Sequence, residues 1–334
     1  MKKIFFCFLF LILFLNPVYA EKLFSVTDDA IYVTNDLGQS WKSIYIEAIG
    51  FAHYTDMCFL KPSRTMYLST TSGILKSFDG GTKWSKIHFG SDTVFRTIKS
   101  SLDGADVIYA LSDTGLYLST NGGNNWKSLA LPSTQIFFVA PFYNSGVIYI
   151  AGNEGIYVSR NGGKDWKRIG VKKILSSNIS CISVNPSNTS QMYVATSKGL
   201  FYTPDGGATW KDRTISRNVN IVTQKVIWAS DNTSLLYVLD GDVKEEGRYY
   251  LRVSSDGGKR WTLIGEQDEI TLFAINPSNS SFVCFLGNEP VMYGTEEGTK
   301  ASFVHFSSNR GKDWKKVRNI VTFYGIKHLY VRPW

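Results

Sequence analysis

The chain has 334 residues, of which 43% are hydrophobic and 14% aromatic, so it can bury a large core. Its formal charge of +8 is modest and spread along the chain, which argues against a nucleic-acid-binding stripe. Its four cysteines show neither disulfide-framework nor zinc-ligand spacing, so neither stabilising device is expected.

The first twenty residues have the pattern of a secretory signal. Lys2 and Lys3 precede an apolar run of about a dozen residues, shorter than the roughly 20 that a membrane span needs. Small residues follow at 18–20, and Cys7 lies inside the apolar run, where a lipoprotein cleavage site is not expected. We therefore predict a signal peptide over 1–20, cleaved after Ala20. The mature chain, with a charge of +8 − 2 = +6, would be periplasmic or extracellular.

An eight-residue segment, here called the box, then recurs seven times. It reads TNDLGQSW from 34, SFDGGTKW from 77, STNGGNNW from 119, SRNGGKDW from 159, TPDGGATW from 203, SSDGGKRW from 254 and SSNRGKDW from 307. The tryptophans that close the copies are Trp41, Trp84, Trp126, Trp166, Trp210, Trp261 and Trp314. They are 43, 42, 40, 44, 51 and 53 residues apart. A period of this length indicates a repeat architecture.

The sequence around each box repeats as well. A β-rich pair broken by a glycine turn precedes it, such as IYALSDTGLYLS, and a short strand such as WKSL follows. A further apolar strand, such as CISVNPSN, precedes each hairpin. Four short strands per period, without helical periodicity, predict an all-β protein. We expect one seven-bladed β-propeller over 21–334, with a box between the third and fourth strands of each blade.

The two ends of the chain are expected to share a blade. The mature N-terminus leaves no room for an innermost strand before the first hairpin, whereas 325–333 resembles an innermost strand without a hairpin after it. The C-terminal strand is therefore expected to complete the first blade, which removes an open sheet edge.

The box residues suit a tight turn. The second glycine is present in all copies, which predicts a positive φ there, whereas Leu37 and Arg310 replace the first glycine and mark it as a preference. The opening Ser or Thr and the acidic or amide residue can accept hydrogen bonds from the turn. The latter are Asp36, Asp79, Asn121, Asn161, Asp205, Asp256 and Asn309. One such side chain per blade does not form a calcium site, so we interpret the boxes as structural and expect no metal.

These repeats resemble Asp-box repeats, also called BNR repeats, over essentially all of 23–334. Such repeats occur in sialidases, in the sortilin ectodomain and in the photosystem II stability and assembly factor family, which this chain resembles most in repeat number, length and export signal. That resemblance implies a non-enzymatic scaffold that binds a protein partner. Sialidases carry an Arg-Ile-Pro strand near the start, which is absent here, and sortilin-type ectodomains have ten blades and a cysteine-rich tail.

Charged residues in the connections between blades form two groups. The boxes and the Asn-Pro-Ser-Asn turns are expected on one face of the disc, and these groups on the other. The basic group is Lys172, Lys173, Arg213 and Arg217, and the acidic group is Glu266, Asp268, Glu269, Glu289, Glu296 and Glu297. Each is either a solvated rim or part of a polarised face that steers a protein partner.

The innermost strands suggest a third set. Five residues before the proline-like end of each strand stand Met57, Arg96, Ile136, Cys181, Lys225, Leu272 and His328. Charges are rarely buried unpaired. Arg96, Lys225 and His328 are therefore expected to line the channel mouth, where they meet either an anionic group or solvent.

The leading hypothesis is an exported, non-enzymatic scaffold without a cofactor that binds another protein, for example in the assembly of a membrane or envelope complex. A glycosidase is the rival, and Asp56 and Asp92 are its candidate carboxylates. A third hypothesis is carbohydrate binding through exposed aromatic side chains, with Tyr54, Phe89 and Tyr324 as candidates.

Overall fold

The computed structural model is described here for most of the chain. The described residues are 22–27, 30–44, 46, 52–61, 63–87, 93–133, 135–216, 218, 220–242, 244, 248–268, 270–290, 300–318 and 328–332. For 266–268, 271, 288–290, 300–302, 318 and 328 the description covers the backbone alone. The predicted signal peptide over 1–20 lies outside these residues.

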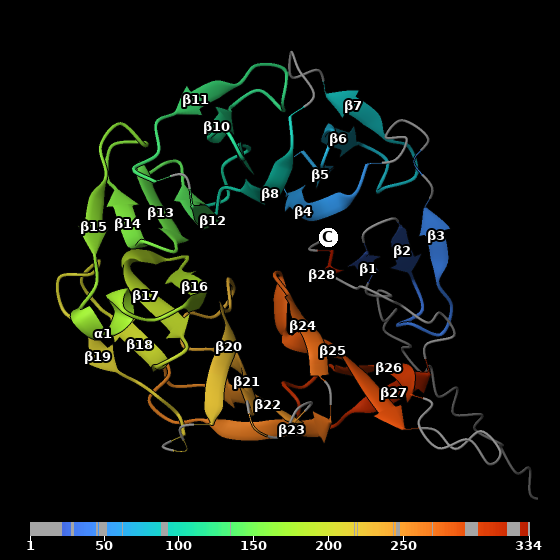
Figure 1. Ribbon diagram of the computed structural model, residues 1–334. Helices are drawn as coiled ribbons and strands as arrows, with labels where there is room; N and C mark the ends of the chain where they lie inside the picture. The colour runs from blue at the N-terminus through green and yellow to red at the C-terminus, as the bar shows by residue number, and fades with distance from the viewer. Residues whose placement is uncertain are drawn as a thin grey trace, which may run out of the picture.

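Seven four-stranded antiparallel sheets form the blades of a ring (Figure 1). Given from the innermost strand outward, blade 1 is β28 (His328–Val331), β1 (Leu23–Val26), β2 (Ile31–Thr34) and β3 (Lys42–Ile44). Blade 2 is β4 (Tyr54–Leu60), β5 (Thr65–Thr70), β6 (Gly73–Ser77) and β7 (Ser85–Ile87). Blade 3 is β8 (Phe95–Ser100), β9 (Ile108–Ser112), β10 (Leu116–Ser119) and β11 (Lys127–Leu129). Blade 4 is β12 (Ile136–Phe142), β13 (Val147–Gly152), β14 (Gly155–Ser159) and β15 (Lys167–Ile169).

The remaining blades follow the same order. Blade 5 is β16 (Ile179–Asn185), β17 (Asn188–Thr196), β18 (Gly199–Thr203) and β19 (Lys211–Asp212). Blade 6 is β20 (Ile221–Trp228), β21 (Leu236–Asp242), β22 (Arg248–Ser254) and β23 (Thr262–Asp268). Blade 7 is β24 (Ile270–Asn276), β25 (Asn279–Pro290), β26 (Lys300–Ser307) and β27 (Lys315–Arg318). A short helix, α1 (Lys172–Leu175), lies between blades 4 and 5. Among the described residues, no helix has the length and apolarity needed to cross a bilayer.

Apolar packing between neighbouring blades forms the core. In the described part of the chain, each of seven apolar clusters joins two adjacent blades, the last joining blade 7 to blade 1. Second strands such as β13 are buried on both faces for this reason, whereas outermost strands such as β15 expose their lysines and arginines. Each box tryptophan packs on the cluster that its blade shares with the preceding blade; Trp126 of blade 3, for example, packs between blades 2 and 3. The box therefore fastens blade to blade.

The predicted closure of the ring is confirmed. β28 pairs antiparallel with β1, with Leu23 opposite Val331, so the two ends of the chain complete blade 1 (Figure 1). Leu329 and Val331 also join the cluster that contains Val304 of blade 7. The final strand thus supplies both the inner edge of one blade and part of an interface.

The box turns use the hydrogen bonds that the sequence suggests. In all seven copies the opening hydroxyl accepts a bond of 2.8–2.9 Å from the N–H of the second glycine. The Asp or Asn Oδ1 accepts a bond of 2.7–3.0 Å from the N–H four residues later. The second glycine has φ between +79° and +93°, and the first position, Leu37 and Arg310 included, has φ between +59° and +74°. The carboxylates therefore serve their own turns. The described residues contain no group of three or more His, Cys, Asp or Glu side chains suited to a metal.

Replacing Gly163 by alanine is expected to destabilise the protein more than replacing Gly162. Both residues have positive φ, but a Cβ at Gly163 would lie 3.0 Å from Leu129 Cδ1, whereas no atom lies within 4 Å of a Cβ at Gly162. The positive φ strains the backbone of both alanine variants. The close contact of the new Cβ with Leu129 of blade 3 adds about 1 kcal/mol of destabilisation for Gly163→Ala alone. Urea unfolding measures the difference, and equal midpoints for the two variants would contradict the assignment.

Candidate functional site

The two kinds of turn share one face of the ring, as expected. The backbone N–H at the first glycine position of a box donates to the chain at or just after the turn between the first two strands of its own blade, for example Gly206 N to Ser190 O near the start of β17 at 2.7 Å. Gly257 N and Ser234 O make the same contact in blade 6, at 2.9 Å. We call this side the box face.

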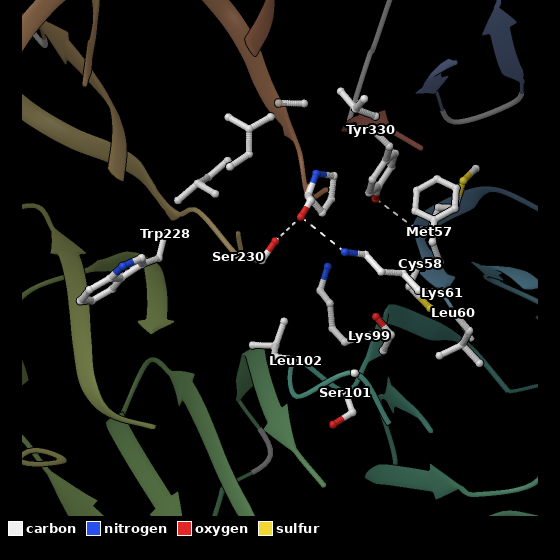
Figure 2. Close-up of a pocket in the computed structure, with 18 of the residues that line it drawn as sticks. Met57, Cys58, Leu60, Lys61, Lys99, Ser101, Leu102, Trp228, Ser230 and Tyr330 are labelled. Carbon is white, nitrogen blue, oxygen red and sulfur yellow. Dashed lines mark hydrogen bonds between the residues drawn. The ribbon is translucent and has the colours of Figure 1, made fainter. Parts of the chain in front are cut away.

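A cavity of about 420 Å³ lies at the centre of the ring on the box face. Its walls come from the innermost strands β4, β8, β20, β24 and β28 and from the turns that follow four of them. Most of the lining is apolar and includes Met57, Leu102, Trp228 and Leu329. Three lysines from two sides of the ring, Lys61, Lys99 and Lys225, also line it. Figure 2 shows the amino groups of Lys61 and Lys99 pointing into the space.

Asp56 ties three blades together beside this cavity. Its side chain is 2% exposed and forms an ion pair of 2.7 Å with Lys99 Nζ of blade 3. The hydroxyls of Thr97 in blade 3 and of Tyr330 in blade 1 both donate to the same carboxylate. The backbone N–H groups of Met57 and Ile98 add bonds of 2.9 and 3.1 Å. Asp56 thus links β28, β4 and β8 through four hydrogen bonds and one ion pair.

Lys61 lies at the cavity mouth. Its Nζ donates to the carbonyl of Pro277 in blade 7 at 3.4 Å, and Ser230 of blade 6 donates to the same oxygen (Figure 2). Burial lowers the pKa of Lys61, and the negative charge of Asp231 opposes that change. These contacts connect blades 2, 6 and 7 across the rim of the cavity.

Lys225 lies deeper, on β20. Its Nζ donates to the carbonyl of Phe273 at 3.1 Å and stands 5.1 Å from the centre of the Phe273 ring. Burial lowers the pKa of Lys225, and the positive charge of Lys99 acts in the same direction. Cavity, lysines and Asp56 together make this the candidate site.

Of the three basic residues predicted at the channel mouth, only Lys225 is placed in the cavity. Arg96 forms an ion pair with Asp113, which lies in the turn between β9 and β10 on the opposite face, and both side chains are about half exposed. His328 is described by its backbone alone, which pairs with Val26. The expectation that Arg96 and Lys225 share one mouth is therefore wrong.

A β-bulge explains the error. Each innermost strand from β4 to β24 has a register shift near its start, for example between Phe95 and Thr97 and between Thr223 and Lys225. Arg96 is the extra residue of its bulge, whereas Lys225 follows the bulge of β20 and is equivalent to Asp56 and Thr97. The bulge lies at the equivalent place in these strands, so the error comes from counting back from strand ends that are one position out of step. Lys61 and Lys99, which the sequence analysis missed, were recognisable as lysines at the ends of apolar innermost strands.

The basic group in the blade connections is brought together in part. Lys173 of α1 forms an ion pair of 2.8 Å with Asp212 of blade 5, so the two connections are neighbours as expected. Arg213 Nε is buried and has no hydrogen-bond partner among the described residues, and Tyr193 and Tyr202 lie within its electrostatic reach. Its side chain thus reaches into the blade interface. Lys172 belongs to α1 and is exposed, and Arg217 lies outside the described residues.

Most of the acidic and aromatic candidates lie outside the described residues. Of the acidic group, Glu269, Glu296 and Glu297 lie outside the described residues, as do the side chains of Glu266, Asp268 and Glu289. Asp92, Phe89 and Tyr324 also lie outside them. Tyr54 is 1% exposed, so the expectation that its ring is available to a sugar is wrong. Cys58 and Cys284 are buried and Cys181 is half-buried.

Comparisons with known proteins agree with the fold. The family model described as Sortilin, neurotensin receptor 3 (Sortilin-Vps10) matches residues 154–289, less than half of the chain. No curated protein sequence matches. Among solved structures, YCF48 bound to D1 peptide is 16% identical with a TM-score of 0.57, covering 84% of this chain and 85% of that one.

Two enzymes are similar to a comparable degree. The GH74 enzyme of Niastella koreensis is 19% identical with a TM-score of 0.63, covering 79% of this chain and 45% of that one. The GH74 xyloglucanase of Xanthomonas campestris is 14% identical with a TM-score of 0.66, covering 94% of this chain and 52% of that one. The chain thus spans about half the length of these enzymes. At such identities the likeness shows the fold alone: the chain is a seven-bladed β-propeller.

Proposed function

We propose that this protein is a non-enzymatic scaffold that binds an acidic, partly apolar segment of a protein partner over the cavity mouth on the box face. The observation that carries the proposal is the cavity itself, whose mostly apolar walls include three lysines, with the amino groups of Lys61 and Lys99 pointing into the space (Figure 2). Asp56 pairs with Lys99 and Asp231 acts on Lys61, which leaves the three lysines in excess of these two carboxylates, so an acidic segment would complement the site.

The surroundings support a peptide as the ligand. Leu102 at the cavity edge is 44% exposed and offers apolar surface next to Lys61. The closed ring holds both residues on rigid strands and short turns. A partner can therefore bind there without first reorganising the backbone of the site. The structural likeness to YCF48 bound to D1 peptide is in keeping with peptide binding by this fold.

The proposal includes a place of action. The N-terminal pattern of two lysines, an apolar run and small residues at 18–20 supports export. The resemblance to the photosystem II stability and assembly factor family supports a role in assembling a membrane or envelope complex. The partner would then be another exported or membrane protein.

Glycoside hydrolysis is less well supported by this site. A glycosidase needs two carboxyl groups about 5–10 Å apart at its substrate. In the described part of the chain, no Asp or Glu lines the cavity, and Asp56 beside it is occupied by five donors.

Charge reversal at the mouth should reduce partner capture. Lys61→Glu would repel an acidic segment, and Leu102→Asp would remove apolar contact, so each should weaken binding roughly tenfold, Lys61→Glu mainly through slower association. A photo-crosslinking residue at position 102 captures the partner from an envelope extract, and the isolated partner is then titrated against each variant.

Lys172→Glu is the matched control, because Lys172 lies on α1 on the opposite face. It should leave binding and crosslinking unchanged. Loss of binding in Lys172→Glu with normal binding in Lys61→Glu would place the partner on the wrong face for this proposal.

A further inference from the structure

Lys225 has surroundings that differ from those of a structural lysine. An ammonium group has three donors, yet in the described residues Lys225 Nζ makes one hydrogen bond, to the carbonyl of Phe273. It has no carboxylate in direct contact there, although it lines a cavity that is open to solvent at Lys61. Apolar side chains of β20 and β24, including Ile227 and Phe273, form the adjoining wall.

The charged and titratable groups that act on Lys225 come from four other strands. They are Cys181 of β16, Lys99 of β8, Cys284 of β25 and Asp56 of β4. Burial lowers the pKa of Lys225 and Lys99 lowers it further, whereas the other three oppose the shift. A lysine that is desolvated and next to a second cation holds more of its neutral amine near neutral pH, the form that acts as a nucleophile.

We propose that Lys225 reversibly forms an imine with an aldehyde or ketone carried on an apolar group that enters the central cavity. The Nζ lone pair attacks the carbonyl carbon to give a carbinolamine. One N–H proton is transferred to the former carbonyl oxygen. The C–O bond of the carbinolamine then breaks, the hydroxyl takes the second N–H proton and leaves as water, and the nitrogen lone pair forms the C=N bond. No oxidant or reductant is required. This capture site lies inside the cavity whose mouth is proposed to bind the partner, and imine formation itself requires no partner.

The cavity suits such a ligand. Its volume of about 420 Å³ lies within the range of about 300–1,000 Å³ found for small-molecule sites. Such sites are mostly apolar with a few placed polar groups, as here. Lys99 and Lys61 can also contact a carboxylate on the same ligand, since both amino groups point into the space (Figure 2).

Reductive trapping tests the proposal on the full mature chain. The protein is incubated with benzaldehyde and cyanoborohydride, and peptide mapping compares Lys225 with Lys164, an exposed lysine of the blade 4 box. Because the lowered pKa of Lys225 raises the fraction of its neutral amine, Lys225 should be labelled faster than Lys164 at pH 7.5. Equal or slower labelling of Lys225 would overturn the inference.

Two variants separate a reactive amine from mere accessibility. Lys225→Arg keeps the charge and should lose the adduct, while Lys164 is labelled as before. Lys99→Met removes the neighbouring cation, so the pH of half-maximal Lys225 labelling should rise, whereas Lys164→Met should leave it unchanged. A pH profile unaffected by Lys99→Met would contradict the proposal, even if Lys225→Arg proved too unstable to analyse.

Discussion

Deletion of 326–334 should lower the melting temperature by at least about 10 °C and cause the protein to self-associate. The deletion removes β28 and with it the buried side chains of Leu329 and Val331, each worth about 1.5–3 kcal/mol. It also removes the Tyr330 hydroxyl from Asp56. The inner edge of β1 would lose its partner strand, and an unpaired edge invites pairing with another molecule.

Two milder variants calibrate this result. Deletion of 333–334 leaves β28 whole and should change the melting temperature little. Tyr330→Phe keeps the strand and removes only the hydroxyl, so its effect should lie between the two. Differential scanning calorimetry with light scattering measures both properties. A monomeric 326–334 deletion with an unchanged melting temperature would show that the closing strand contributes little.

The box segments made the blades predictable from sequence. Their glycines, hydroxyls and tryptophans recur at a regular period because each copy makes the same local hydrogen bonds and packs on the preceding blade. The closing strand was predictable for a different reason. In the sequence, the first blade lacked an innermost strand, and the last predicted strand had no hairpin after it. β28 is that last strand, and it supplies the innermost strand of blade 1.

The site was harder to predict because it depends on register. Arg96 is the bulge residue of its strand, whereas Lys225 is the residue after the bulge of its own, so an error of one position in counting along the strand separates the two side chains. Asp56 meets Tyr330 across 274 positions of sequence, a contact that no local pattern indicates. Arg213 was predicted at the rim because it follows the outermost strand of blade 5, whereas its side chain acts on Tyr193 and Tyr202 of the two preceding strands.

Ring closure and the candidate site share the same residues. Tyr330 lines the cavity and donates to Asp56, and Asp56 holds Lys99 at the cavity wall. A change that opens the seam between β28 and β1 would therefore also displace a lysine of the site. Stability and binding should be coupled for variants at Asp56, while variants at Lys61 should affect binding alone.

Asp56→Ala should destabilise the protein by about 2–4 kcal/mol, whereas Asp113→Ala should cost less than about 1 kcal/mol. Both changes break an ion pair with a basic residue of β8, but Asp56 is buried and Asp113 is half exposed. The first also removes the acceptor for Thr97 and Tyr330, while the second leaves Arg96 in solvent. Urea unfolding measures the loss of stability in the two variants, and similar losses would show that Asp56 does not stabilise the contact between the blades.

Asp56→Asn adds a functional test. A glycosidase that uses this carboxylate would lose hydrolysis of a polysaccharide panel, whereas a scaffold would show no hydrolysis before or after the change.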